Sequence, residues 1–247
     1  MLNFMRIITL LFAFVAAAFA ETPAEENKPA PEKFNAPKEV APGVFEIGVV
    51  RVDKTANTVS FPAKVNMVDG LLEYLLVTPQ GSAHESLFVT DAPPKEVHMA
   101  MLLLGAKGME QPKDGAAQGR IDSEFLARAP KLTGDKITIT AVWKDKDGKE
   151  QVTPVERWIV RMIHSRKKAS ETVPAADGPW LYTGSYFYGK HFVAQTEGSL
   201  ASLVTYPGAL INNPRSGSND DHQWYVNKET APPKDTPVTF TIKLEPK

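Results

Sequence analysis

The sequence contains no cysteine among its 247 residues. This absence excludes a disulfide scaffold, a zinc site held by thiolates and an iron–sulfur cluster held by cysteine. An excess of one charge is also missing, because 28 lysines and arginines stand against 29 aspartates and glutamates. A chain so close to neutral has no overall field that would attract nucleic acid or an anionic membrane. We therefore predict no nucleic-acid partner and no resident cofactor, with a divalent metal as the alternative considered below.

Long apolar runs are scarce as well, and the one conspicuous run stands at the start of the chain. Arg6 precedes the apolar run Ile7 to Ala17, and the triplet Ala18 to Ala20 follows it. A basic residue, a short apolar run and a small-x-small ending are typical of a secretory signal peptide. The run is shorter than the roughly 20 residues that a membrane-spanning helix needs. We predict a cleaved signal peptide at residues 1–20, no membrane anchor after cleavage, and a periplasmic or extracellular protein.

The next segment is rich in proline and charge. Residues 21–42 hold five prolines, five glutamates and three lysines. Such a composition buries too little apolar surface to offset the entropy lost on ordering. We predict a linker at residues 21–42 and a single folded domain at residues 43–247.

Short apolar or alternating runs separated by turn residues predict strands along most of this domain. Pro62 lacks an amide donor, which predicts an edge or a bulge in the second strand. The predicted strands cover residues 44–52, 58–67, 71–78, 84–90, 137–143, 152–163, 180–188, 192–196, 202–206, 224–226 and 238–244.

One helix is predicted, over Lys95 to Leu104. Val97, Met101 and Leu104 recur at helical spacing there, and Gly105 is placed to end the helix. Residues 105–135 are rich in glycine and predict a long surface insertion. The expected fold is mainly β with minor α (α+β), with antiparallel sheets, one covering helix and this insertion.

Several short segments carry a family resemblance: Glu73 to Val77, His84 to Leu87, His98, Ala100, Leu102, Gly105, Trp180, Tyr182, Gly184, Ser185, Phe192, Ala194, Gly198, Ser199, Trp224 to Asn227 and Thr236 to Val238. In this order they resemble the YdjY-like domain, a family of exported bacterial proteins without an established activity. The resemblance covers roughly residues 43–245 and implies a fold family, with no catalytic residues to carry over.

Two histidines form a candidate metal site. His84 lies on a predicted strand and His98 on the helix that follows, so packing of the helix on the strand would bring the imidazoles together, with Glu85 or Glu96 nearby. The other interpretation, which we favour, is that His98 is a hydrogen-bonded packing residue. The triplet Asp220 to His222 would also ligate a cation, although a solvated loop is the simpler account.

Four aromatic residues form the candidate ligand-binding surface. Trp180, Tyr182, Tyr186 and Tyr188 share one parity of a predicted strand. Rings on one strand face are usually core, but an exposed row of them would stack on sugar rings or on side chains of a partner.

These observations favour a non-catalytic binding or interaction module of the cell envelope, with an envelope protein or polysaccharide as its partner. The alternative is a metal-binding protein or metal-dependent hydrolase that uses His84 and His98.

Overall fold

The computed structural model describes residues 34–110, 132–163 and 170–246. The chain divides into two units, Met1–Lys33 and Phe34–Lys247, and all described residues belong to the second. The predicted signal peptide, the first part of the predicted linker and most of the predicted insertion lie outside the described residues. The described part is mainly β, as predicted.

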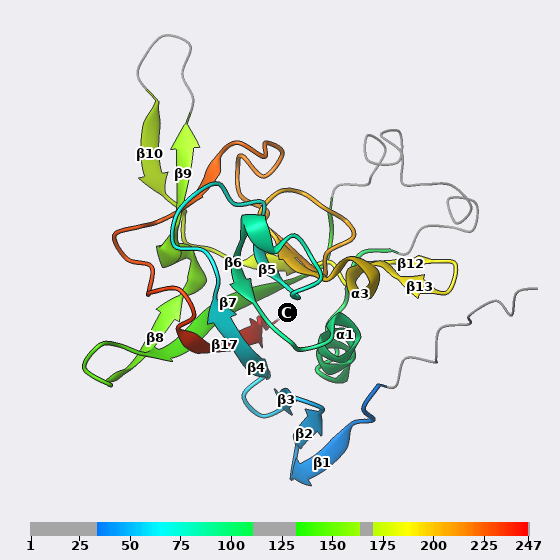
Figure 1. The fold of residues 1–247 in the computed structure, drawn as a ribbon. Helices are drawn as coiled ribbons and strands as arrows, with labels where there is room; N and C mark the ends of the chain where they lie inside the picture. Colours follow the sequence, from blue (N-terminus) through cyan, green and yellow to red (C-terminus); the bar gives the residue numbers. More distant parts are fainter. Residues whose placement is uncertain (1–33, 111–131, 164–169, 247) are drawn as a thin grey trace, which may run out of the picture. The chain divides into compact units, whose positions relative to one another are not determined.

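Eight strands form a closed ring, because each pairs with the next and the last pairs with the first (Figure 1). A closed ring leaves none of its strands at an open edge. In ring order they are β4 (Thr58–Val65), β17 (Pro237–Leu244), β7 (Asp135–Lys144), β11 (Trp180–Tyr182), β15 (Ile211–Asn212), β14 (Ser199–Ser202), β5 (Tyr74–Val77) and β6 (Ser86–Val89).

Alternate residues of the long strands fill the core. On β7, Ile137, Ile139 and Ala141 are buried on one parity, as predicted. The neighbouring β17 contributes Phe240, whose ring stacks on Phe61 of β4 with centroids 5.5 Å apart. The alternation of apolar and polar residues therefore gives the register of this part of the ring correctly.

Pro62 marks the place where β4 changes partner. On one side β4 pairs with β3 (Val50–Asp53) through Thr58 to Ser60, and further along with β6 through Lys64 and Val65. Pro62 stands between these stretches, and its carbonyl accepts a hydrogen bond of 2.6 Å from the Thr90 hydroxyl. The missing amide of proline therefore costs no ladder hydrogen bond at this point.

Two strand pairs are parallel rather than antiparallel. β5 and β6 run parallel, as do β14 and β15. The expectation of antiparallel sheets is therefore wrong for these two pairs. The strand predicted at residues 84–90 begins only at Ser86, because the 3₁₀ turn η1 (Ala83–Glu85) precedes it. His84 accordingly lies on a turn and not on a strand.

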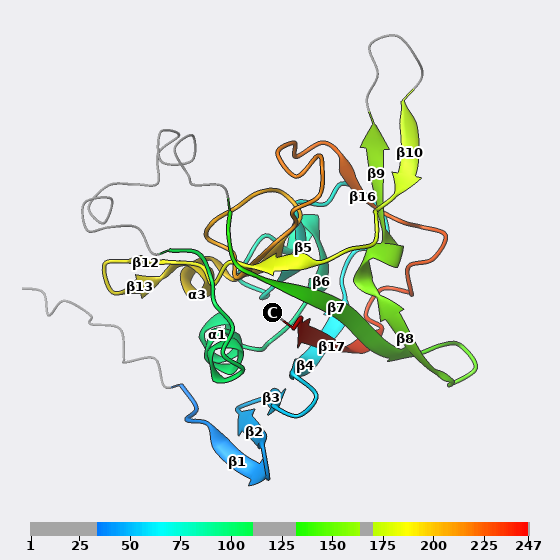
Figure 2. The ribbon, with the colours of Figure 1, turned by 180° about the vertical axis from the view of Figure 1, so that it is seen from behind.

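Several predicted strands are divided or replaced, because local turns interrupt their apolar runs. Residues 44–52 form the hairpin of β2 (Val44–Ile47) and β3, and residues 152–163 form β8 (Glu150–Pro154), the 3₁₀ turn η3 (Val155–Trp158) and β9 (Ile159–Ile163). β9 belongs to a separate sheet with β10 (Glu171–Pro174) and β16 (Trp224–Val226), as Figure 2 shows.

Residues 180–188 divide into β11 and β12 (Phe187–Tyr188), and β12 pairs with β13 (His191–Phe192). The predicted strand at 202–206 is instead β14, which ends at Ser202, and that at 192–196 is mostly the helix α3 (Val193–Glu197).

The predicted helix is present as α1 (Pro94–Leu103). Its Val97, Ala100 and Met101 are buried in the core, and the helix contacts β3, β4 and α3. Gly105 follows it with a φ of 81°, which suits a residue without a side chain. No helix in the described part of the chain is long and apolar enough to cross a membrane.

The folded unit begins earlier than predicted. β1 (Lys38–Ala41) lies in the predicted linker and pairs with β2 although all four of its residues are exposed. Asn35 donates its backbone and side-chain amides to Oε1 of Glu96 over 3.2 and 2.8 Å. Backbone pairing and one buried carboxylate therefore hold a segment that its composition marks as unstructured.

We predict that Gly48→Ala destabilises the protein more than Gly43→Ala does. Both glycines have positive φ (57° and 74°), which costs an alanine about 1 kcal/mol. A Cβ on Gly48 would also lie 2.5 Å from Oε2 of the buried Glu96, whereas the nearest atom to one on Gly43 is 3.7 Å away. Urea unfolding should show an additional loss of about 1–2 kcal/mol for Gly48→Ala. Equal losses for the two variants would mean that Glu96 is not held in place.

Candidate functional site

The two histidines of the predicted metal site have different surroundings. The His84 side chain is 77% exposed, and its Nε2 lies 3.7 Å from Oε2 of Glu85. His98 packs against Phe192 with ring centroids 4.9 Å apart and shares a hydrogen bond of 2.7 Å between its Nδ1 and the Tyr182 hydroxyl. Burial lowers the pKa of His98 to about 4, so the ring is neutral at neutral pH. These contacts are those expected of a packing histidine.

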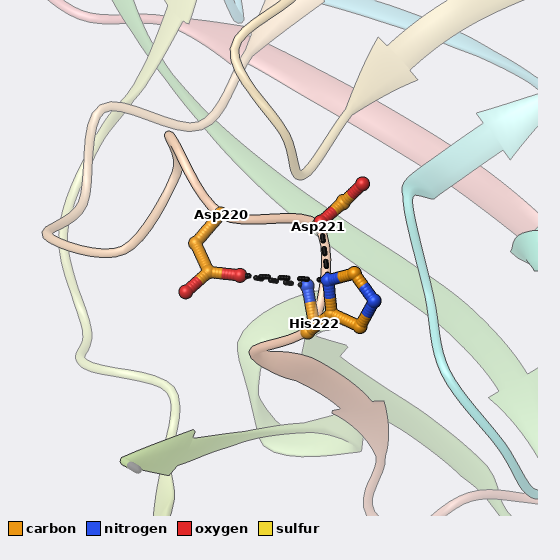
Figure 3. A group of neighbouring side chains, drawn as sticks. All are labelled: Asp220, Asp221 and His222. Atoms are coloured by element: carbon orange, nitrogen blue, oxygen red, sulfur yellow. Dashed lines mark hydrogen bonds and ion pairs between the residues drawn. The ribbon is translucent and has the colours of Figure 1, made fainter. Parts of the chain in front are cut away.

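One group of three metal-ligand side chains occurs in the described part of the chain, and it includes neither His84 nor His98. It consists of Asp220, Asp221 and His222, whose ligand atoms lie within 4.8 Å of one another (Figure 3). Nδ1 of His222 is 2.5 Å from Oδ1 of Asp221, and Asp220 accepts a hydrogen bond of 2.9 Å from the His222 backbone amide. This is the geometry of a polar turn.

The same turn lies near His84, because the residues that follow the turn and His84 are hydrogen-bonded to neighbouring residues just before β5. The Leu72 amide donates to the Trp224 carbonyl over 2.9 Å, and the Glu73 amide donates to the Glu85 carbonyl over 3.0 Å. Burial raises the pKa of the Glu73 carboxyl, and the charges of Glu85 and Asp221 raise it further. No sequence pattern pointed to this group of carboxylates, since Glu73, Glu85 and Asp221 come from three separate segments.

The four aromatic residues do not form an exposed row. Gly184 and Ser185 both have positive φ and turn the chain after β11, so the alternation is lost. Trp180, Tyr182 and Tyr186 are buried, and only Tyr188 is partly exposed. The expectation of a continuous strand with a shared aromatic face is therefore wrong.

Trp180 instead belongs to a buried charged cluster. Its indole Nε1 donates to Oε1 of Glu156 over 2.7 Å, and the Arg215 guanidinium lies 4.9 Å above its ring. Arg215 forms an ion pair of 2.7 Å with Glu156, with both side chains at most 10% exposed, and also donates to the carbonyls of Ala176 and Gly178. Such a satisfied network joins segments of the fold, and each of its named donors already has a partner.

A cleft of about 360 Å³ opens beside Pro62, where β4 changes partner. Pro62 and Lys64 are exposed on β4, while Phe61 and Val65 of the same strand are in the core, so the cleft is on the outer side of the ring. Its walls are mainly apolar, and Val49 in the turn between β2 and β3 is 53% exposed. The apolar lining consists of Val49, Pro62, Ala63, Pro79, Val89, Ala92 and Pro237.

Charged groups line the rest of the cleft. Lys64 forms an ion pair of 2.8 Å with Asp235, and Asp91 is the third charged residue of the lining. The hydrogen bond to Asp235 and its charge raise the pKa of Lys64, and the same contact lowers the pKa of Asp235. No histidine, serine or glutamate is among the residues that line the cleft, and the Thr90 hydroxyl donates to Pro62. This lining is suited to binding and offers no nucleophile with an adjacent base.

Sequence reasoning missed the cleft. Its lining comes from five separate parts of the chain, and only Pro62 carried a signal, namely that the β-ladder would be interrupted there.

The family model of the YdjY domain matches residues 50–243. The matched range begins at β3 and includes the whole ring except the last residue of β17. The match confirms the resemblance predicted from the sequence. No curated protein and no solved structure matches the chain.

We predict that His98 makes the stability of the protein depend on pH. The native pKa of about 4 lies below the ordinary value of 6.5, so the unfolded chain binds a proton between these values and the native chain does not. The stability contributed by neutral His98 is complete above about pH 6.5 and is lost as the pH falls toward 4, by about 3 kcal/mol in total.

Urea unfolding at about pH 7.5 and pH 4.5 measures this effect. His98→Gln should lose less stability on acidification than the wild type, by about 2 kcal/mol. Tyr182→Phe is the matched control, because it removes the hydrogen bond and keeps the burial, and it should retain the wild-type pH dependence. A wild-type dependence in His98→Gln would contradict the assignment.

Proposed function

The chain belongs to the YdjY domain family, and we propose that it is an exported, non-catalytic binding module that holds an apolar group of its ligand in the cleft beside Pro62. The observation that carries the proposal is the cleft itself: about 360 Å³, with mainly apolar walls and a few charged groups. Ligand sites are typically concave and apolar with a small number of polar groups, and their volumes begin at about 300 Å³.

The position of the titratable groups supports binding over catalysis. The lining of the cleft includes no histidine, and His98 shares its hydrogen bond with Tyr182 in a buried position. General acid–base chemistry needs a group with a pKa near the working pH, and the ion pair of Lys64 with Asp235 moves the pKa values of both groups away from neutral pH.

The burial of the aromatic residues supports a protein of the cell envelope over a polysaccharide as the partner. Sugar binding commonly uses exposed rings, and Trp180, Tyr182 and Tyr186 are buried. The prolines and valines of the cleft are suited to aliphatic side chains. Export is supported by the basic residue, short apolar run and small-residue ending at residues 6–20.

The test uses the chain without the predicted signal peptide and the small probe N-acetyl-prolyl-leucinamide. Two-dimensional amide NMR should show saturable shifts at cleft residues such as Val49, Val89 and Asp91. Val49→Ser should weaken binding about fivefold to tenfold, because it removes an apolar contact of about 1 kcal/mol.

Val152→Ser is the matched control, since Val152 is 63% exposed on β8 and is not part of the cleft lining. It should bind the probe as the wild type does. Shifts that fall elsewhere, or equal weakening by both substitutions, would overturn the proposed function.

A further inference from the structure

We infer that the cleft selects an extended peptide segment of a partner protein in which an apolar side chain is followed closely by lysine or arginine. The inference rests on the proposed function, because it names the class of ligand that the same cleft would hold.

The charges of the cleft are not balanced. Two carboxylates, Asp91 and Asp235, are accompanied by one cation, Lys64, among the residues of the lining. Lys64 lies 2.8 Å from Asp235, and the charge of Asp91 also raises the pKa of Lys64, so one cation stands beside two carboxylates. Among the residues that the structure describes, no cation lies within ion-pair distance of Asp91. The rim therefore has one carboxylate that a ligand cation would complement.

The backbone beside Asp91 is well defined. The hydroxyl of Thr90 donates to the Pro62 carbonyl over 2.6 Å and accepts from the Ala92 amide over 3.0 Å. These two bonds hold Asp91 between fixed neighbours while its side chain is exposed to solvent. A lysine of the ligand would place its ammonium beside this carboxylate and its aliphatic stem along the apolar wall.

The walls favour contact with side chains over pairing with a strand. Pro62, Pro79 and Pro237 have no amide hydrogen, and the Pro62 carbonyl is already bonded to Thr90. A partner therefore cannot add a strand to β4 at this point, unlike partners that bind by β-augmentation.

The exposed Val49 favours a peptide over a small amine. It belongs to the turn between β2 and β3, and β3 and β17 flank β4 on opposite sides. A ligand that contacts both Val49 and Pro237 must cross β4, a span of about 10 Å, which an extended peptide does.

The experiment compares three peptides that differ at one position, acetyl-Ser-Pro-Leu-Pro-Lys-Ser-amide and its Gln and Glu counterparts, on the chain without the signal peptide. NMR titration at low salt should give an affinity about threefold to fivefold higher for the Lys peptide than for the Gln peptide, and a lower one for the Glu peptide. Added sodium chloride should reduce the difference, because salt screens exposed charges.

Two substitutions test the role of the rim. Asp91→Asn should remove the preference for lysine and leave the affinity for the Gln peptide unchanged. Asp235→Asn releases Lys64 and should shift the preference toward the Glu peptide. Asp147→Asn, in the exposed turn after β7, is the matched control and should preserve the wild-type order.

The outcomes separate the two proposals. Equal binding of all three peptides at the cleft, weakened by Val49→Ser, would overturn the charge selectivity and support the proposed function. Absence of binding by every peptide and by N-acetyl-prolyl-leucinamide would overturn both. A lysine preference that persists in Asp91→Asn would also overturn the inference.

Discussion

The fold depends on a short seam between β4 and β6, which closes the ring. Only two residue pairs join these strands, Lys64 with Val89 and Val65 with Phe88. Asn66 extends the seam, because its backbone amide donates to the Leu87 carbonyl over 2.8 Å and its side-chain amide to the Ser86 carbonyl over 2.9 Å. Closure therefore relies on side-chain hydrogen bonds as well as on the β-ladder. The cleft exists because β4 must leave β3 before it reaches β6.

Prediction from the sequence was best where apolar and polar residues alternate along a strand. The ranges expected for β7, β16 and β17 agree closely with the structure, since each has its apolar residues on one buried side. The one predicted helix agrees with α1 to within one residue at each end, because Pro94 and Gly105 delimit it. The family resemblance, which rested on residues from Glu73 to Val238, was also correct.

The errors have a common physical cause: the structure of a short segment is decided by the backbone segments, distant in sequence, that it contacts. Residues 193–197 contain valine and threonine and read as a strand, yet Gly198 adopts φ of 69° and ends a helical turn there. β1 has no buried side chain and is held by its pairing with β2, which no composition reveals. The parallel arrangement of β5 and β6 is set by η1 and not by the apolar pattern. For the same reason His84 could not be placed beside His98 by strand parity, and the cleft could not be found from any one motif.

The uneven attachment of β3 has a dynamic consequence for the molecule. β3 is joined to β4 by three residue pairs, whereas β17 is joined to β4 by seven. Segments with fewer cross-strand hydrogen bonds open at lower free energy and exchange their amide protons sooner. The wall that carries Val49 is thus the compliant side of the cleft, and the wall made by β4 and β17 is the rigid side. A shift of this wall would change the width of the opening without breaking the closed ring.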